Sequence, residues 1–260
     1  MSAIDQAIEM AMVEAKEHER EGRLREARAI YARVLVQIPS HRKAKKLLKA
    51  IDRRMGGTPT LEPWELQTLV ELYEKQEVAR ALPMAQRLAK QHPEQPMLQN
   101  VLGSIYVQQG QADKAAAAFL QSLEAEPGFP DALTNLAQLY LAQQNWAGAL
   151  DCLEQLKAST TLDAHGQFLL GMCLHQLGRM DEALPCYSES ARTRPLFGPV
   201  HINLGSVLWA LGRTSEALTS FENALELQPD DPEANGFMGN LLLELGREDD
   251  ARLYLAKGAQ

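Results

Sequence analysis

The stretch LGSVLWALGRTSEALTSFENALELQP, residues 204–229, is the part of the sequence that decides the fold. Apolar residues recur in it at helical spacing, first up to Gly212 and then again beyond it. Two small residues, Gly205 and Ala217, stand at fixed distances from the large Phe221. Glycine ends helices readily because it adopts the left-handed backbone conformation without a steric penalty. The stretch therefore predicts two short helices joined by a tight turn at Gly212.

Four columns of residues repeat this pattern every 34 residues through most of the chain. The proline column is Pro59, Pro93, Pro127, Pro195 and Pro229, with Thr161 in the remaining slot, and the alanine column is Ala81, Ala115, Ala149, Ala183, Ala217 and Ala251. The small column is Gly103, Ala137, Gly171, Gly205 and Gly239, and the large column is Phe119, Leu153, Tyr187, Phe221 and Leu255. Units of this length bury their apolar faces only by stacking on their neighbours. The period predicts units that begin near residues 62, 96, 130, 164, 198 and 232.

These columns resemble the tetratricopeptide repeat (TPR) family, whose unit is a 34-residue helix–turn–helix with small residues and prolines at these spacings. The resemblance covers residues 62–260 and implies an all-α fold, a right-handed superhelical TPR solenoid of stacked helix pairs. Residues 62–95 depart from the pattern by placing Leu69 in the small column. Because Thr161 replaces the proline, we expect a longer or looser connection over residues 158–163.

The N-terminal residues 1–55 have a different organisation. Gly22, Ala27, Tyr31 and Pro39 repeat the second half of a unit, and a helix over 41–54 follows with one apolar and one basic face. The basic face carries Arg42, Lys43, Lys45, Lys46, Lys49, Arg53 and Arg54. No second helix follows, since glycines at 56 and 57 interrupt the chain and the register is lost. We therefore expect a TPR-like repeat plus an unpartnered basic helix over 1–55, a linker over 56–61, and the main array over 62–260.

Composition and motifs exclude several classes of function. The net charge of −8 is unevenly distributed. Residues 1–58 hold 13 basic and 8 acidic side chains (net +5), whereas residues 59–260 hold 13 basic and 26 acidic ones (net −13). Because most of the chain is acidic and repels phosphates, nucleic-acid binding is disfavoured. The sequence has no membrane-spanning apolar run and no secretory signal, which predicts a cytoplasmic protein. Catalytic and phosphate-binding motifs are missing, and the histidines and three cysteines lack metal-ligand spacing. We expect buried cysteines, no cofactor, no metal and no enzymatic activity.

The resemblance implies that the first helix of each pair lines a concave groove that binds a peptide. The predicted groove residues are Asn135, Gln138, Leu141, Phe168, Met172, His175, Ile202, Asn203, Ser206, Trp209 and Asn240. The first helices from residue 130 onwards contain no Lys or Arg, which argues against the family members that clamp a C-terminal carboxylate. The expected partner is a protein or an extended peptide, neutral to mildly basic, with spaced apolar residues.

Several alternatives stay open. Asn135 and Asn203 are placed to bind a peptide backbone, but asparagine is also common there in TPRs, and Trp209 is either a binding anchor or a filler between helices. The basic helix is a solvated face, a docking site for an acidic partner such as another copy in a homo-oligomer, or a weak site for anionic lipid or nucleic acid.

A rival function follows from Leu253 and Leu255, which no later repeat covers. In that alternative the chain is the N-terminal TPR arm of a larger enzyme, sulfotransferase-like or sugar-transferase-like, that positions substrate or mediates oligomerisation.

Overall fold

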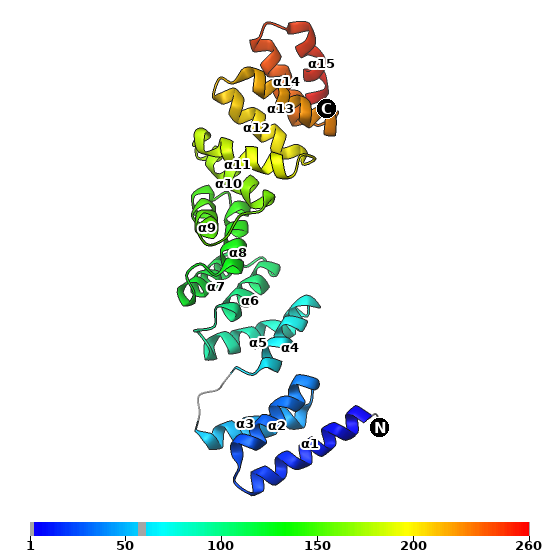
Figure 1. Cartoon of the computed structure of the whole chain (residues 1–260), viewed down its shortest axis with the longest axis vertical. Coiled ribbons are helices and arrows are strands. Elements are labelled where there is room, and N and C mark those ends of the chain that lie inside the picture. The colour runs from blue at the N-terminus through cyan, green and yellow to red at the C-terminus, as the bar shows by residue number, and fades with distance from the viewer. Residues whose placement is uncertain (1–2, 57–60, 260) are drawn as a thin grey trace. The chain divides into compact units, whose positions relative to one another are not determined.

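The computed structural model describes residues 3–56 and 61–259, with side chains from residue 6 onwards. These residues form fifteen α-helices and no strand, which confirms the all-α prediction (Figure 1). The chain divides into two compact units, residues 1–127 and 128–260. Most of the predicted linker, residues 57–60, lies outside the described residues, and the expected domain boundary there stays a prediction.

The helix bounds follow the repeat period. Unit 1 contains α1 (Ala3–Arg20), α2 (Leu24–Gln37), α3 (Arg42–Met55), α4 (Pro63–Glu74), α5 (Val78–Gln91), α6 (Pro96–Gln108) and α7 (Ala112–Ala125). Unit 2 contains α8 (Pro130–Ala142), α9 (Trp146–Ser159), α10 (Ala164–Gln176), α11 (Met180–Thr193), α12 (Gly198–Ala210), α13 (Thr214–Leu227), α14 (Pro232–Glu244) and α15 (Glu248–Gly258). The first helices α6, α8, α10, α12 and α14 therefore begin 34 residues apart, as predicted.

First helices that carry a glycine of the small column cross their second helices closely, at the point where this glycine meets the large column. A Cβ atom built on Gly205 would lie 2.5 Å from Cε1 of Phe221, and one built on Gly171 would lie 2.8 Å from Cδ1 of Tyr187. Phe221 and Tyr187 are both fully buried. A glycine in the first helix thus makes room for an aromatic ring of the second, which lets the two helices cross closely.

Turns between paired helices use the left-handed backbone conformation where glycine permits it. Gly178 and Gly212 have φ values of +75° and +74°. Gln144 takes the same conformation with φ 55° in the turn between α8 and α9, which lacks the glycine. The left-handed turn therefore also forms where the sequence has no glycine.

The connection around Thr161 differs from its prediction. Four residues, 160–163, join α9 to α10, and four also join α11 to α12 and α13 to α14. The expectation of a longer connection was wrong because Asp163 caps α10 at the usual position: its side chain accepts a hydrogen bond from the Gly166 amide at 2.7 Å, as Asp231 does from the Ala234 amide at 2.8 Å in the repeat that keeps its proline. Leu162 is buried and anchors the same segment.

Helix α3 packs on α2, and the same core takes in a residue from α4. Ala44, Leu48 and Ile51 of α3 are buried in it, together with Trp64 of α4. Arg28 of α2 pairs with Asp52 of α3 at 2.8 Å and also with Glu62, next to α4. The basic helix therefore buries its apolar face within unit 1.

Replacing Gly171 with leucine should lower the free energy of unfolding by about 1–3 kcal/mol, because the added side chain would overlap the Tyr187 ring. Gly236→Ala in α14 is the control, since a Cβ there meets no atom within 4 Å; alanine should stabilise that helix by about 0.5–1 kcal/mol. Chemical denaturation measures both. Equal unfolding midpoints for wild type and Gly171→Leu would contradict the crossing.

The three cysteines are buried, as predicted, and burial raises the pKa of Cys152 and of Cys173 to about 11. At pH 8 such a thiol is about 0.1 % thiolate, against about a quarter for an exposed thiol of pKa 8.5. We expect native protein to react with DTNB only slowly and urea-unfolded protein to react at once at all three thiols. Rapid labelling of the folded chain would show that these residues are accessible.

Candidate functional site

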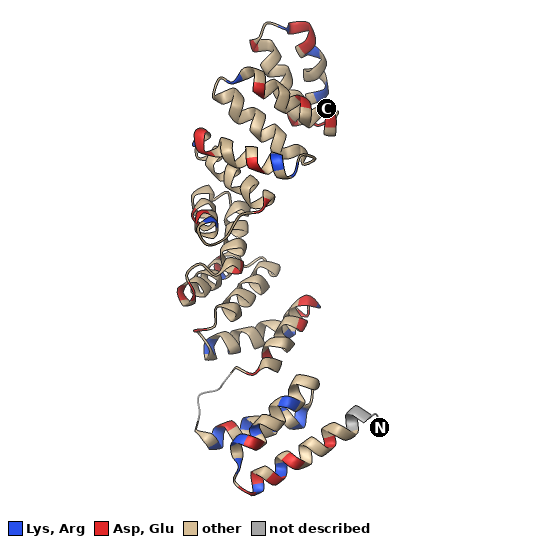
Figure 2. Ribbon diagram, viewed as in Figure 1, with Lys and Arg blue, Asp and Glu red and all other residues tan. Residues whose placement is uncertain are grey.

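Three first helices of unit 2, α10, α12 and α14, lie side by side. Helix α10 contacts α12, and α12 contacts α14, while each is backed by its own second helix. We call the side of α8, α10, α12 and α14 that carries the predicted groove residues the first-helix surface. These four helices contain no Lys or Arg, and in Figure 2 they are mostly free of charged side chains. Any ligand there meets amides, hydroxyls and apolar groups rather than cations.

The predicted groove residues differ in exposure. Asn135, Leu141, Met172, His175, Asn203, Ser206 and Trp209 are half-buried, and Gln138 and Asn240 are exposed. Phe168 and Ile202 are only 8 % and 5 % exposed. Half-buried side chains are held in place and still reachable, so the first group contains the best candidates for ligand contact.

Phe168 and Ile202 are part of the packing instead. The Phe168 ring lies 5.1 Å from that of Phe197 in an edge-to-face contact and 5.9 Å from that of Tyr187. Ile202 packs with Ala224 and Ala234. Helical spacing placed both residues on the first-helix side, but the aromatic residue of the turn and the neighbouring repeat cover them.

Asn203 is positioned by two hydrogen bonds. Its Nδ2 donates to the carbonyl of Pro199 at 2.9 Å, and its Oδ1 accepts from the Tyr187 hydroxyl at 3.4 Å. An amide has two donor hydrogens and two acceptor lone pairs, so one of each remains for a ligand. The amide is therefore fixed in orientation and retains the capacity to pair with a peptide backbone.

Tyr187 has a polar role that sequence reasoning missed. Its place in the large column predicts only a buried ring, and burial raises the pKa of its hydroxyl. The hydroxyl nevertheless reaches the next repeat and contacts Asn203. The sequence did contain a signal for this role: a phenylalanine would fill the same space, so a tyrosine at this position indicates that its hydroxyl group has a partner.

Trp209 has the packing contacts of a residue that fills space between helices. Its ring meets Phe237 of α14 edge to face, with centroids 6.4 Å apart, and its Nε1 donates to Oε2 of Glu244 at 2.7 Å. These contacts link α12 to α14, as a space-filling residue would. The indole remains half-buried, so part of it faces outward in a fixed orientation.

His175 lies in an apolar setting. Burial lowers the pKa of its imidazole, whose ring stands edge-on to Tyr187 at 6.2 Å. Its Nδ1 is buried and has no hydrogen-bond partner among the described residues. His175 is therefore neutral near pH 7.

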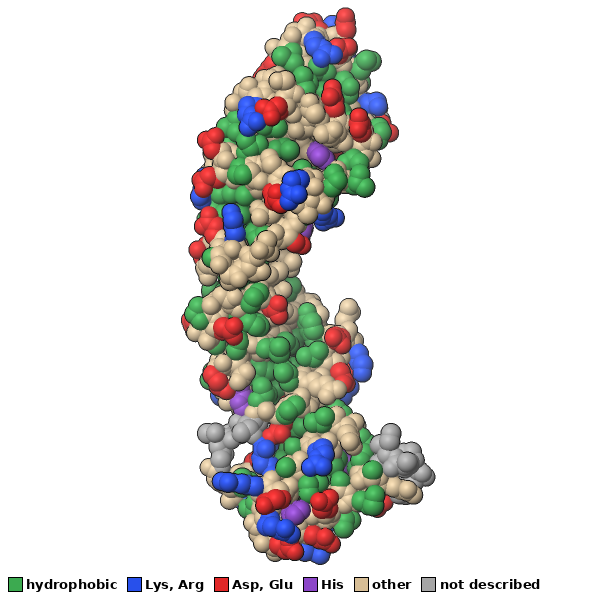
Figure 3. All heavy atoms as spheres, viewed as in Figure 1, with side chains coloured by type: hydrophobic (Ala, Val, Ile, Leu, Met, Phe, Trp, Pro, Cys, Tyr) green, Lys and Arg blue, Asp and Glu red, His purple; other side chains and the backbone are tan. Residues whose placement is uncertain are grey.

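The basic face of α3 is a separate candidate. Lys45 stacks over Trp64 with its Nζ 4.6 Å from the ring centre, and burial lowers its pKa. Arg42, Lys43, Lys46, Lys49 and Arg53 are exposed. Figure 3 shows blue side chains among red ones over this part of unit 1. Electrostatic contact through these five stays a prediction, whereas Lys45 is occupied by its own packing.

Residues 3–56 and 61–259 contain neither a metal-binding cluster nor a membrane-spanning helix. No group of three or more His, Cys, Asp or Glu side chains there is placed to hold a metal ion. No helix in these ranges is long and apolar enough to cross a membrane.

Comparison with protein-family models identifies the repeats of this sequence. Three models described as tetratricopeptide repeat match residues 106–167, residues 70–133 and 202–260, and residues 160–230. The chain belongs to the tetratricopeptide repeat family. The predicted family is thus confirmed, and the matched ranges together run from residue 70 to residue 260. No curated protein sequence matches the chain.

Solved structures with this fold include two TPR proteins. A crystal structure of MamA is 20 % identical with a TM-score of 0.57, covering 61 % of this chain and 92 % of that one. A crystal structure of YrrB, described as a TPR protein with an unusual peptide-binding site, is 18 % identical with a TM-score of 0.61 and covers 67 % and 90 %. At these identities the likeness shows the TPR solenoid fold.

The environment of His175 predicts a pH dependence of stability. Its folded pKa lies below the unfolded value of about 6.5. Above that pH the imidazole is neutral in both the folded and the unfolded state, so it adds no pH dependence to the free energy of unfolding. As the pH falls below it, the unfolded chain binds a proton that the folded chain resists, so stability falls. His175→Leu should flatten the decline of unfolding free energy between pH 7 and 5, and parallel curves for the two proteins would contradict this assignment.

Proposed function

We propose that the chain is a non-catalytic scaffold that binds an extended segment of a partner protein on the first-helix surface of unit 2. The observation that carries this proposal is the pairing of Asn203 and Trp209 on α12. The first is an amide with unused hydrogen-bonding capacity, and the second is a half-buried aromatic ring held by Glu244. Membership of a repeat family that forms extended binding surfaces supports the same function.

The two residues suit different parts of a peptide. An amide pairs with a backbone N–H and C=O whatever the ligand's sequence, whereas a fixed indole accepts an apolar side chain. Successive residues of an extended chain are about 3.3 Å apart and alternate in direction, so apolar residues need regular spacing to meet successive helices. Met172 on α10 and the exposed Asn240 on α14 extend the surface to either side of α12.

The charge of the surface selects against acidic ligands. The four first helices contain Asp131, Glu233 and Glu244 but no Lys or Arg. Glu244 already accepts a hydrogen bond from Trp209. A neutral or mildly basic segment with spaced apolar residues therefore fits best. The peptide-binding site in the description of YrrB agrees with this class of ligand.

Peptide-array selection on the wild-type chain, followed by affinity measurements on variants, tests the proposal. Asn203→Ala should weaken binding of a selected peptide by about 0.5–1.5 kcal/mol through loss of a backbone hydrogen bond. Trp209→Ala should cost about 2 kcal/mol or more if the indole is an anchor.

Matched controls separate binding from folding. Asn223→Ala makes the same change on an exposed part of α13 and should leave affinity unchanged. Trp209→Phe retains a ring against Phe237, so its melting temperature should stay closer to wild type than that of Trp209→Ala. If Asn203→Ala and Trp209→Ala bind every selected peptide as tightly as wild type, the first-helix surface is not the site.

The cytoplasmic location and the self-association expected from the sequence stay part of the proposal. Self-association through the exposed basic residues of α3 would weaken as salt concentration rises, because surface charges are screened. Association through Leu253, which is 70 % exposed, would not.

A further inference from the structure

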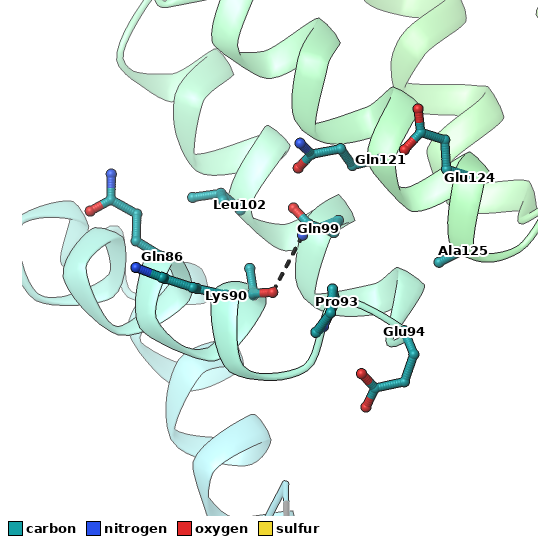
Figure 4. Close-up of a pocket in the computed structure, with 10 residues that line it drawn as sticks. Gln86, Lys90, Pro93, Glu94, Gln99, Leu102, Gln121, Glu124 and Ala125 are labelled. Carbon is teal, nitrogen blue, oxygen red and sulfur yellow. Dashed lines mark hydrogen bonds between the residues drawn. The ribbon is translucent and has the colours of Figure 1, made fainter. Parts of the chain in front are cut away.

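A groove in unit 1 lies between two second helices. Helix α5 supplies one wall, with Gln86, Ala89 and Lys90, and helix α7 supplies the other, with Gln121, Glu124 and Ala125. Gln99 and Leu102 of α6 form the floor, and Pro93 and Glu94 close one end (Figure 4). Its volume of about 630 Å³ is within the range of pockets that hold small ligands or single side chains.

The floor of the groove contains an amide with an unsatisfied acceptor. Gln99 is 94 % buried, since only 6 % of its surface is exposed. Its Nε2 donates to the carbonyl of Ala89 at 3.5 Å, which fixes the orientation of the amide because a flipped amide would set two oxygens against each other. Oε1 is buried and accepts no hydrogen bond from any described residue. Figure 4 shows this oxygen on the side of the amide away from Ala89, toward Gln121.

A buried acceptor without a donor costs free energy, which a ligand's N–H group would recover. The side chains of Gln86 and Gln121 that flank the floor are exposed. They can change rotamer without moving the backbone. Gln121 is the nearer of the two to Oε1 in Figure 4, and a change of its rotamer would let a ligand approach this oxygen.

Charges at the rim indicate what kind of donor fits. Glu94 and Glu124 lie at one end of the groove, and Lys90 lies at the other (Figure 4). Both carboxylates are exposed acceptors, and the floor amide lies between them and Lys90. A cation at that end gains from both carboxylates and is remote from Lys90.

We propose that this groove binds an arginine side chain of a partner protein. A guanidinium has five N–H donors in one plane and a positive charge, so it can donate to Gln99 Oε1 while its charge is attracted by the carboxylates of the rim. Its methylene stem suits the apolar wall of Leu102, Pro93 and Ala125. This site lies on second helices of unit 1, so it is independent of the peptide surface proposed on unit 2.

The repeat supplies a matched control. A groove in unit 2 between α9 and α11 has Gln167 and Leu170 on its floor, 68 residues after Gln99 and Leu102. Gln167 is half-buried rather than buried. The same residue type therefore occupies the same repeat position without the buried acceptor. Gln167→Met should leave arginine binding in unit 1 unchanged.

The experiment is an NMR titration of the full 15N-labelled chain with the capped peptide acetyl-Ala-Ala-Arg-Ala-Ala-amide. The side-chain amide signals of Gln99, assigned by their absence in Gln99→Met, should shift and saturate. A peptide with citrulline, the neutral counterpart of arginine, should bind about fivefold more weakly, because charged donors form stronger hydrogen bonds. Gln99→Met, which keeps the side-chain length, should weaken the arginine peptide by about tenfold or more.

The rim gives a second test that does not disturb the buried residue. Glu94→Gln combined with Glu124→Gln should weaken the arginine peptide several-fold and reduce its salt dependence. Thermal unfolding checks that each variant is folded. If Gln99→Met is not folded, the arginine-peptide affinity of the double variant tests the proposal instead. Equal binding of the arginine and citrulline peptides, full affinity in the double variant, or binding of free arginine without the peptide would each overturn the proposal.

Discussion

The close crossing between a glycine or alanine of the first helix and a large residue of the second is the constraint on which the structure depends. A Cβ at Gly103 would lie 2.5 Å from Cε1 of Phe119, and the same conflict recurs at Gly239 with Leu255. Helix pairs that cross so closely accept only a small residue in the first helix, and the pair with Leu69 in this column has the small Ala85 in the large column instead. The columns therefore repeat along the chain because each pair must solve the same packing problem. The N-terminal pair solves it too, with the fully buried Ala15 and Tyr31 sixteen residues apart, like Gly103 and Phe119.

The side chains of the proposed peptide site lie at positions that the crossing does not use. In α12 the crossing takes Gly205, while Asn203 and Trp209 lie outside it and remain half-buried. Their orientation still comes from the packing, since Tyr187 of the large column holds Asn203 and Phe237 of the next repeat holds Trp209. The same framework thus fixes the backbone and orients the side chains that a ligand would meet.

The sequence predicted the features that depend on one repeat and failed for those that depend on neighbours. Helix starts, turns and the Gly171 crossing follow from local spacing, and all agree with the structure. The longer connection near Thr161 was wrong because the capping by Asp163 was not recognised. Phe168 has the helical position of a groove residue, but Phe197 from the following turn packs against it. The groove over Gln99 needs three helices to form, so no pattern in one of them indicates it.

One repeat position shows how a shared backbone acquires local chemistry. Gln99, Leu133, Gln167, His201 and Asn235 are equivalent in the period. His201 and Asn235 each contact a proline carbonyl of the preceding turn, at 2.8 and 3.0 Å, and so tie one repeat to the next. Leu133 has no polar side-chain group for such a contact and is fully buried. Gln99 keeps a tie, to Ala89, but its longer side chain lies beneath an open groove where Asn235 has no exposed surface. A residue type that serves inter-repeat packing elsewhere therefore has a different setting here, because one extra methylene group carries the amide beneath a groove whose lining residues Gln86 and Gln121 are exposed.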